Sequence, residues 1–161
     1  MSKKVQTPAM DYDTLKLRER MAKKRYCIGI DPGTYTGFAV WDTKEREFIS
    51  LHTLQIHKAF EMLQKCIYGF GQENIHVRFE DARLRKWFGE SGREQLQGAG
   101  SIKRDSTIWD DYLSELKISF EKVAPKKNKT KMNAEPFGRL TKYKGRSSEH
   151  ARDAAMLVFG M

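Results

Sequence analysis

Residues 25–33 read Arg25-Tyr26-Cys27-Ile28-Gly29-Ile30-Asp31-Pro32-Gly33, a short alternating stretch that ends in a carboxylate and a chain-breaking dipeptide. Successive side chains of a strand point to opposite faces, so one face carries Tyr26, Ile28 and Ile30 and the other carries Cys27, Gly29 and Asp31. Pro32-Gly33 ends the strand. Because glycine has no Cβ, we expect Gly29 to leave open space beside Asp31. The stretch predicts a strand that places Asp31 at its end.

The segments after this strand alternate between strand and helix patterns. Residues 36–41 and 47–54 flank a polar stretch and predict an antiparallel hairpin. Apolar residues at helical spacing over 56–70 predict a helix that crosses over to a strand at 75–80, which ends in Glu80. Three strands and a crossover helix of this kind favour a mixed sheet.

The rest of the chain completes an α/β pattern. After an irregular loop at 84–92, we predict a helix over 96–116 that is interrupted near Gly98 and Gly100. A strand over 118–124 and a loop or mobile arm over 126–146 come next. Ser147 or Ser148 then caps a last helix that runs to about Phe159. The sequence therefore predicts an α/β fold with a five-stranded mixed sheet flanked by helices.

Composition indicates one soluble domain with a polyanionic partner. The chain has 161 residues, 39% of them hydrophobic, and a formal net charge of +9. A basic balance of this size favours nucleic acid. No apolar run approaches the ~20 residues of a membrane span, so we expect no membrane contact and a cytoplasmic location.

The positive charge is concentrated in two segments. Residues 1–25 carry eight basic and three acidic residues, and residues 122–146 carry nine basic residues against Glu135 alone. The second segment could be a solvated charge run without a partner. A phosphate-contacting arm is the alternative that we favour, because cations that neutralise phosphates release condensed counterions. Its Lys-rich part contains Lys126, Lys127, Lys129 and Lys131.

Carboxylates end the two strands that the crossover helix joins. Asp31 alone could form a turn and Glu80 alone could be solvated, but parallel neighbouring strands would place them about 5 Å apart at one sheet edge. On the last helix His150 and Asp153 are i, i+3 neighbours, and Glu149 and Asp153 are i, i+4 neighbours. These acids could simply favour the N-terminus of that helix.

Together these side chains predict a metal site. A cluster of acids is costly unless divalent metal neutralises it, and carboxylates with at most one His suit Mg²⁺ or Mn²⁺. Two such ions about 3.5–4 Å apart can activate water and stabilise the leaving oxygen of a phosphodiester. The predicted reaction is metal-assisted phosphodiester hydrolysis.

Three motifs resemble the RuvC-type crossover junction endonucleases of the ribonuclease H-like superfamily. Residues 28–37 (Ile-Gly-Ile-Asp-Pro-Gly-Thr-Tyr-Thr-Gly) resemble the first motif of that family, Phe79-Glu80 its second acidic strand, and residues 150–155 (His-Ala-Arg-Asp-Ala-Ala) its C-terminal helix. The resemblance covers residues 25–161 and leaves residues 1–24 as a basic N-terminal extension. The compact form is similar to phage-encoded relatives, and a bacterial origin stays open.

This resemblance implies a fold, a reaction and a set of ligands. It implies a ribonuclease H-like fold, a homodimer, and Mg²⁺-dependent symmetric nicking of four-way (Holliday) DNA junctions. Asp31, Glu80 and Asp153 would hold the metal ions, and His150 would fill a fourth site that some members occupy with Asp. Whether His150 ligates metal or carries a proton stays open, as does the role of Glu149.

Further DNA contacts are expected from the loop after Glu80 and from the following helix. The loop mixes cations with large aromatics that could stack on an unpaired base or fold back onto the core. Two cations of the helix could reach phosphates or simply be solvated. These candidate contacts are Arg83, Arg85, Lys86, Trp87, Phe88, Lys103 and Arg104.

Other functions share parts of this pattern. Asp31-Pro32-Gly33-Thr34 with Gly37 also resembles the phosphate-binding hairpin of actin and Hsp70-type ATPases, but those proteins need a second domain that 161 residues cannot supply. A non-catalytic DNA-binding module would have no use for a central acidic cluster. Cleavage of flaps or RNA–DNA hybrids uses the same metal chemistry and stays possible.

Overall fold

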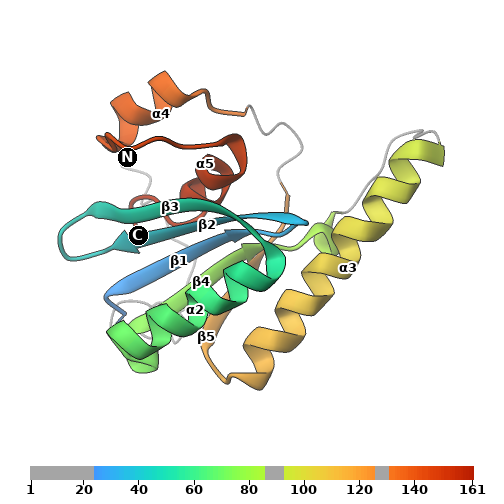
Figure 1. Ribbon diagram of the computed structural model, residues 1–161, viewed down its shortest axis with the longest axis horizontal. Helices are drawn as coiled ribbons and strands as arrows, with labels where there is room; N and C mark the ends of the chain where they lie inside the picture. The colour runs from blue at the N-terminus through green and yellow to red at the C-terminus, as the bar shows by residue number, and fades with distance from the viewer. Residues whose placement is uncertain (1–23, 86–92, 126–130) are drawn as a thin grey trace, which may run out of the picture.

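The computed structural model describes residues 24–85, 93–125 and 131–161, with the side chains of 93–99 excepted. Five strands and four α-helices make up the described chain (Figure 1). The strands are β1 (Tyr26–Asp31), β2 (Tyr35–Asp42), β3 (Glu47–Gln55), β4 (Ile75–Glu80) and β5 (Ser119–Val123). The helices are α2 (Ile56–Phe70), α3 (Arg93–Glu115), α4 (Ala134–Thr141) and α5 (Glu149–Met156), with short 3-10 turns η1 (Gln72–Asn74) and η2 (Ala82–Leu84).

The strands form one mixed sheet in the order β3-β2-β1-β4-β5. Strands β2 and β3 are antiparallel, as the predicted hairpin requires, and β1 is also antiparallel to β2. The crossover through α2 makes β4 parallel to β1, and the crossover through α3 makes β5 parallel to β4. The predicted α/β class and five-stranded mixed sheet are confirmed, and the arrangement is consistent with a ribonuclease H-like fold.

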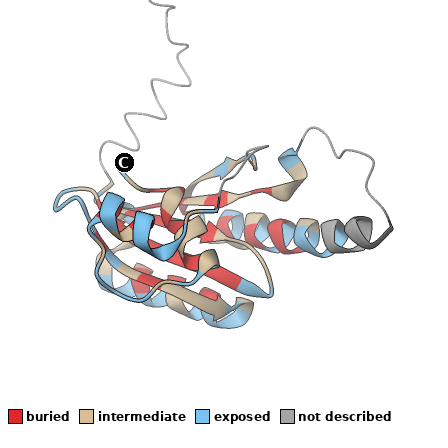
Figure 2. Ribbon diagram, turned by 90° about the horizontal axis from the view of Figure 1, so that it is seen from above, coloured by how far each residue is buried: buried red, intermediate tan, exposed pale blue. Residues whose placement is uncertain are grey.

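Helices cover both faces of this sheet (Figures 1 and 2). The alternation in β1 sends Ile28 and Ile30 toward α2 and α3, where they pack with Leu63 and Trp109. The other face sends Cys27 toward α4 and α5. Figure 2 shows buried residues along the strands and on the inward sides of the helices. The two faces therefore have separate hydrophobic cores.

Three predicted features differ from the structure. Helix α3 runs from Arg93 without a break through Gly98 and Gly100, because isolated glycines lower helix stability without ending a helix. The predicted arm over 126–146 contains α4, whose Phe137 is buried in the core between α4 and the sheet. Regular helix α5 ends at Met156, and turns rather than helix continue to residue 160.

Within the described part of the chain, none of the helices combines the length and the apolar character needed to cross a bilayer.

Candidate active site

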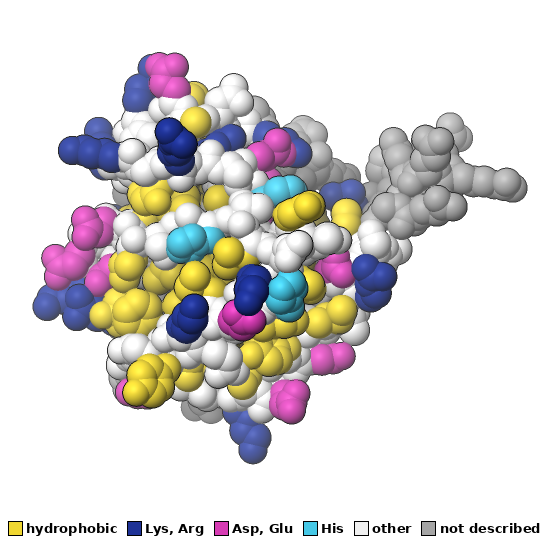
Figure 3. All heavy atoms as spheres, viewed as in Figure 1, with side chains coloured by type: hydrophobic (Ala, Val, Ile, Leu, Met, Phe, Trp, Pro, Cys, Tyr) yellow, Lys and Arg dark blue, Asp and Glu magenta, His cyan; other side chains and the backbone are white. Residues whose placement is uncertain are grey.

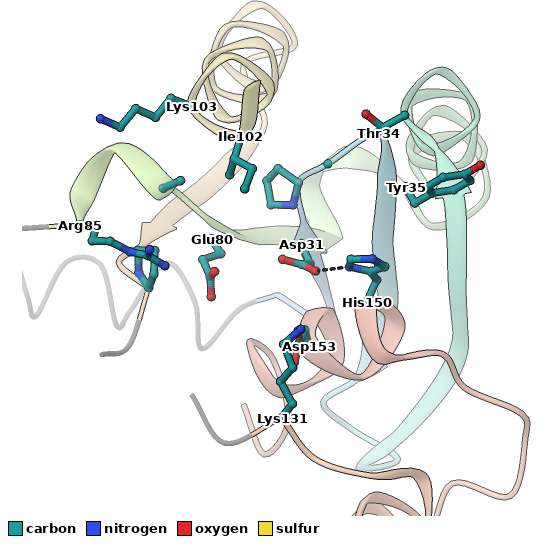
Figure 4. Close-up of a pocket in the computed structure, with 14 residues that line it drawn as sticks. Asp31, Thr34, Tyr35, Glu80, Arg85, Ile102, Lys103, Lys131, His150 and Asp153 are labelled. Carbon is teal, nitrogen blue, oxygen red and sulfur yellow. Dashed lines mark hydrogen bonds and ion pairs between the residues drawn. The ribbon is translucent and has the colours of Figure 1, made fainter. Parts of the chain in front are cut away.

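The parallel pairing of β1 and β4 brings Asp31 and Glu80 to neighbouring strand ends. Ile30 pairs with Phe79, so the next residue on each strand is one of the two acids. Ile30 and Phe79 point into the α2 and α3 core, and Asp31 and Glu80 therefore point to the opposite face. Figure 4 shows both carboxylates directed into one cavity.

Helix α5 lies with its backbone directly on this face of the sheet. A Cβ added at Gly29 would overlap the carbonyl oxygen of Ala154, and one added at Gly37 would overlap that of His150. The sequence suggested that Gly29 leaves open space beside Asp31. This prediction is wrong, because the backbone of α5 fills that space. Only glycine permits this contact, and it sets the position of His150 and Asp153 over the strands.

Both ends of α5 are held by side-chain hydrogen bonds. At its N-terminus the Ser148 hydroxyl accepts a hydrogen bond from the Ala151 amide at 3.2 Å and is hydrogen-bonded to the Thr53 hydroxyl of β3. Ser148, one of the two predicted caps, is thus the cap that forms. Beyond the C-terminus of α5, the Arg78 guanidinium of β4 donates to the carbonyl oxygen of Leu157 at 2.7 Å.

All four predicted catalytic residues line a single cavity of about 400 Å³. His150 and Asp31 are in direct contact, with Nδ1 of the imidazole 3.1 Å from Oδ2 of the carboxylate (Figure 4). The Asp31 side chain is 16% exposed and that of His150 is 51% exposed. Residues separated by up to 122 positions in the sequence therefore meet in one solvent-accessible cavity.

These residues fit a hard divalent cation by their chemistry. Three carboxylates and one imidazole are the ligand types that suit Mg²⁺ or Mn²⁺. Across the described residues, no three His, Cys, Asp or Glu side chains stand in a closed coordination group. The cavity thus collects the ligand types at one place without arranging them around a single point.

Cations surround the acids in the same cavity. Three predicted DNA contacts, Arg85, Lys103 and Lys131, line it together with Asp31 and Glu80. Lys131 also forms an ion pair with Glu149, the acid whose role the sequence left open. Acids flanked by cations suit a phosphodiester substrate, because the cations can contact phosphate oxygens next to a metal site.

Arg83 and Arg104, by contrast, are engaged with neighbouring acids. The Arg83 guanidinium lies 2.6 Å from an Asp81 carboxylate oxygen and 2.5 Å from one of Asp110. Those hydrogen bonds raise the pKa of Arg83. Arg104 lies 3.4 Å from Asp105, and its side chain is 66% exposed. Arg83 thus has a structural role, and DNA contact by either arginine stays a prediction.

Several predicted DNA contacts lie outside the described residues. They are Lys86, Trp87, Phe88, Lys126, Lys127 and Lys129.

The cavity also has an apolar wall that the sequence analysis missed. Tyr35 and Ile102 line it although they are 59% and 45% exposed, and Pro32 and Pro125 lie beside them. Tyr35 directly follows the turn after Asp31. This closeness in sequence to a predicted metal ligand could have indicated that Tyr35 lines the cavity. Ile102 offered none, because its place depends on how α3 crosses the sheet.

Comparisons with known proteins leave the site to be interpreted from its own geometry. No protein-family model matches the chain, and the search of curated proteins finds no significant match.

Proposed function

We propose that the protein is a Mg²⁺-dependent endonuclease of the RuvC type that nicks branched DNA, with the four-way junction as its substrate. The convergence of Asp31, Glu80, His150 and Asp153 on one cavity carries this proposal. The motifs that resemble the RuvC-type nucleases contain these four residues, and the sheet order agrees with a ribonuclease H-like fold.

The chain's own residues divide the work by charge. Asp31, Glu80 and Asp153 would hold Mg²⁺, with His150 either as a fourth ligand or as a proton carrier toward Asp31. When bound, divalent ions supply an activated water and stabilise the leaving oxygen of the phosphodiester. Arg85, Lys103 and Lys131 bind phosphate oxygens at the rim of the cavity and orient the strand. The apolar wall at Tyr35 and Ile102 packs against the sugar or base of the nucleotide.

The proposed substrate also sets the proposed assembly. Resolution of a four-way junction needs two nicks related by symmetry, and each chain contains one cavity of this composition among its described residues. We therefore propose a homodimer that presents two copies of the site to the two strands.

The direct test is cleavage of labelled DNA by the full chain. Purified protein is incubated with a four-way junction, a duplex, a flap and an RNA–DNA hybrid, each with and without Mg²⁺. We expect symmetric nicks in the junction that require Mg²⁺. If the flap or the hybrid is cleaved equally well, the proposed metal chemistry stands but the proposed junction substrate does not. If no substrate is cleaved in a Mg²⁺-dependent way, the nuclease proposal is overturned.

Single substitutions assign the activity to the cavity. We expect Asp31→Asn, Glu80→Gln or Asp153→Asn to lower the nicking rate by more than the ~10–100-fold typical of residues that only support a metal ligand. Junction binding should persist, because each change removes negative charge near phosphate. The matched control is Asp111→Asn, the same substitution at an exposed position of α3 outside the cavity. Wild-type nicking by any of the three site variants would remove that residue from the metal site.

A further inference from the structure

The connector between α4 and α5, residues 142–148, is a basic segment that leads directly into the candidate active site. It carries Lys142, Lys144 and Arg146 and ends at Ser148, which caps the helix of His150 and Asp153. These three cations belong to the basic segment 122–146, for which the sequence favours phosphate contact, but none of them is among the individually predicted DNA contacts. Figure 4 shows the chain entering α5 beside His150.

The connector has two inward side chains among outward ones. Tyr143 and Ser147 are partly buried, whereas Lys142, Lys144 and Arg146 are exposed. The Tyr143 ring packs against Phe48 and Phe137, with ring centroids 6.3 and 6.5 Å away. Because Tyr143 packs against the core, the lysines on either side of it remain at the surface.

Hydrogen bonds fix the connector at both ends. At the α4 end, the Tyr143 amide donates to the Thr141 hydroxyl at 3.2 Å. At the α5 end, Arg152 donates to the carbonyl oxygen of Ser147 and also, at 2.7 Å, to that of Met132. A segment fixed in this way loses little conformational entropy when it binds a ligand.

The charges of the connector are not neutralised by the rest of the described chain. Ion pairs hold Lys58, Lys122 and Lys131, but no described acid pairs with Lys142, Lys144 or Arg146. Figure 3 shows Lys and Arg side chains spread over the upper part of the molecule, where α4 and the connector lie in Figure 1. Three exposed cations on a fixed backbone therefore line the segment that ends at Ser148, the cap of the helix that carries His150 and Asp153.

We infer that Lys142, Lys144 and Arg146 form a phosphate-binding track that guides one DNA strand into the cavity. This inference rests on the proposed function for its substrate and extends the contact surface beyond the cavity rim. The contacts are to the phosphate backbone, so they contribute affinity and register and no sequence preference.

The test compares two double variants of the full chain that remove the same charge. Lys144→Gln/Arg146→Gln removes two track cations, and Lys44→Gln/Lys65→Gln removes two exposed lysines from the β2–β3 turn and from α2. Binding of a synthetic four-way junction and of a single-stranded oligonucleotide is measured in EDTA over a series of salt concentrations, so that cleavage plays no part.

We expect the track variant to lower the slope of log K against log salt by about 1.8 for duplex arms or about 1.4 for a single strand. The control variant should keep the wild-type slope. In a cleavage assay with Mg²⁺, the track variant should raise KM and leave kcat unchanged, as expected for residues that hold the substrate equally in the ground and transition states.

The outcomes separate this inference from the proposed function. A slope that is unchanged in the track variant, or lowered equally in the control, overturns the track whether or not the protein cleaves DNA. A lowered slope in the track variant alone supports the track even if no substrate is nicked, in which case only the nuclease proposal fails.

Discussion

The two faces of the sheet contact their helices in different ways. On the α2 and α3 face, large side chains pack between the elements, as where Phe60 of α2 and Trp109 of α3 meet with ring centroids 4.5 Å apart. On the α5 face, Gly29 and Gly37 bring the helix backbone against the strands, and Ala154 is fully buried between them. The first face holds its helices through interlocking side chains alone, whereas the second combines side-chain packing with a direct contact between the α5 backbone and the strands.

This difference implies that the α2 and α3 face mainly stabilises the fold, whereas the α5 face also positions side chains of the candidate site. Interlocking side chains bury much apolar surface, and this burial stabilises the fold. The backbone contact fixes α5 more tightly, and His150 and Asp153 reach Asp31 from that helix. Damage to the first face should therefore reduce stability, and damage to the second should reduce activity as well.

The largest stability effect is expected from Trp109→Ala on the α2 and α3 face. Trp109 is fully buried, and loss of its side chain should lower the free energy of unfolding by about 3–5 kcal/mol. The nicking rate per folded molecule should stay the same, because α5 is not touched. Urea denaturation gives the stability, and nicking assays at low temperature give the rate.

Tyr68→Ala is the matched control for this substitution. Tyr68 is an aromatic residue on α2 that is 95% exposed, so its removal should change stability by less than about 0.5 kcal/mol. Similar losses in the two variants would contradict the claim that buried side-chain volume stabilises this face.

A smaller stability effect with a larger functional one is expected from Gly37→Ala on the α5 face. The added methyl group overlaps the carbonyl oxygen of His150, and overpacking of this kind costs about 1–3 kcal/mol. Helix α5 must shift to relieve the overlap, so nicking by the folded protein should fall even where the chain remains folded. Denaturation curves and nicking rates are compared for the same samples.

Gly100→Ala makes the same chemical change where there is room for it. No atom lies within 4 Å of a Cβ at Gly100, which is in the exposed interior of α3. Alanine should stabilise that helix by about 0.5–1 kcal/mol and leave nicking unchanged. If Gly37→Ala behaves like Gly100→Ala, then α5 does not depend on a glycine contact.

The sequence predicted the strands and their facing because each signal is local. Alternation in residues 26–31 and 75–80 determines which side chains enter the α2 and α3 core, and it also predicts Asp31 and Glu80 on one face. A single crossover helix between these strands implies parallel neighbours, so their carboxylates were expected to meet. The meeting of Asp31 and Glu80 was predictable from these local patterns, whereas His150 and Asp153 were expected there from the motif of the last helix and its resemblance to the RuvC-type nucleases.

The remaining features depend on contacts that no local pattern encodes. Gly29 contacts Ala154, which is 125 residues away, so the sequence could not show whether its side of the strand is open or filled. Helix α4 was missed because Pro136 and Gly138 weaken the helical signal, although burial of Phe137 stabilises the helix in the folded chain. The ion pair between Arg83 and Asp110 of α3 could not be predicted either, because the two residues are far apart in the sequence.

The smallest loss of stability expected at a contact concerns the charged rim of the α2 and α3 face, where Asp110 of α3 meets Arg83 of η2 and Lys122 of β5. Burial favours the protonated form of Asp110, but the hydrogen bonds from Arg83 and Lys122 outweigh it and lower the pKa of this carboxyl. A lowered pKa in the folded state stabilises the protein above the pKa of an unfolded Asp, about 3.9, and the contribution is lost as pH falls through the folded value.

Asp110→Asn should therefore cost about 1 kcal/mol at pH 7 and flatten the decline in unfolding free energy below about pH 4. Urea denaturation from pH 3 to 7 measures both, with Asp111→Asn, an exposed neighbour on the same helix, as the variant that should keep the wild-type curve. Identical curves for Asp110→Asn and wild type would show that the charged rim does not stabilise this face, leaving its stability to the interlocking side chains alone.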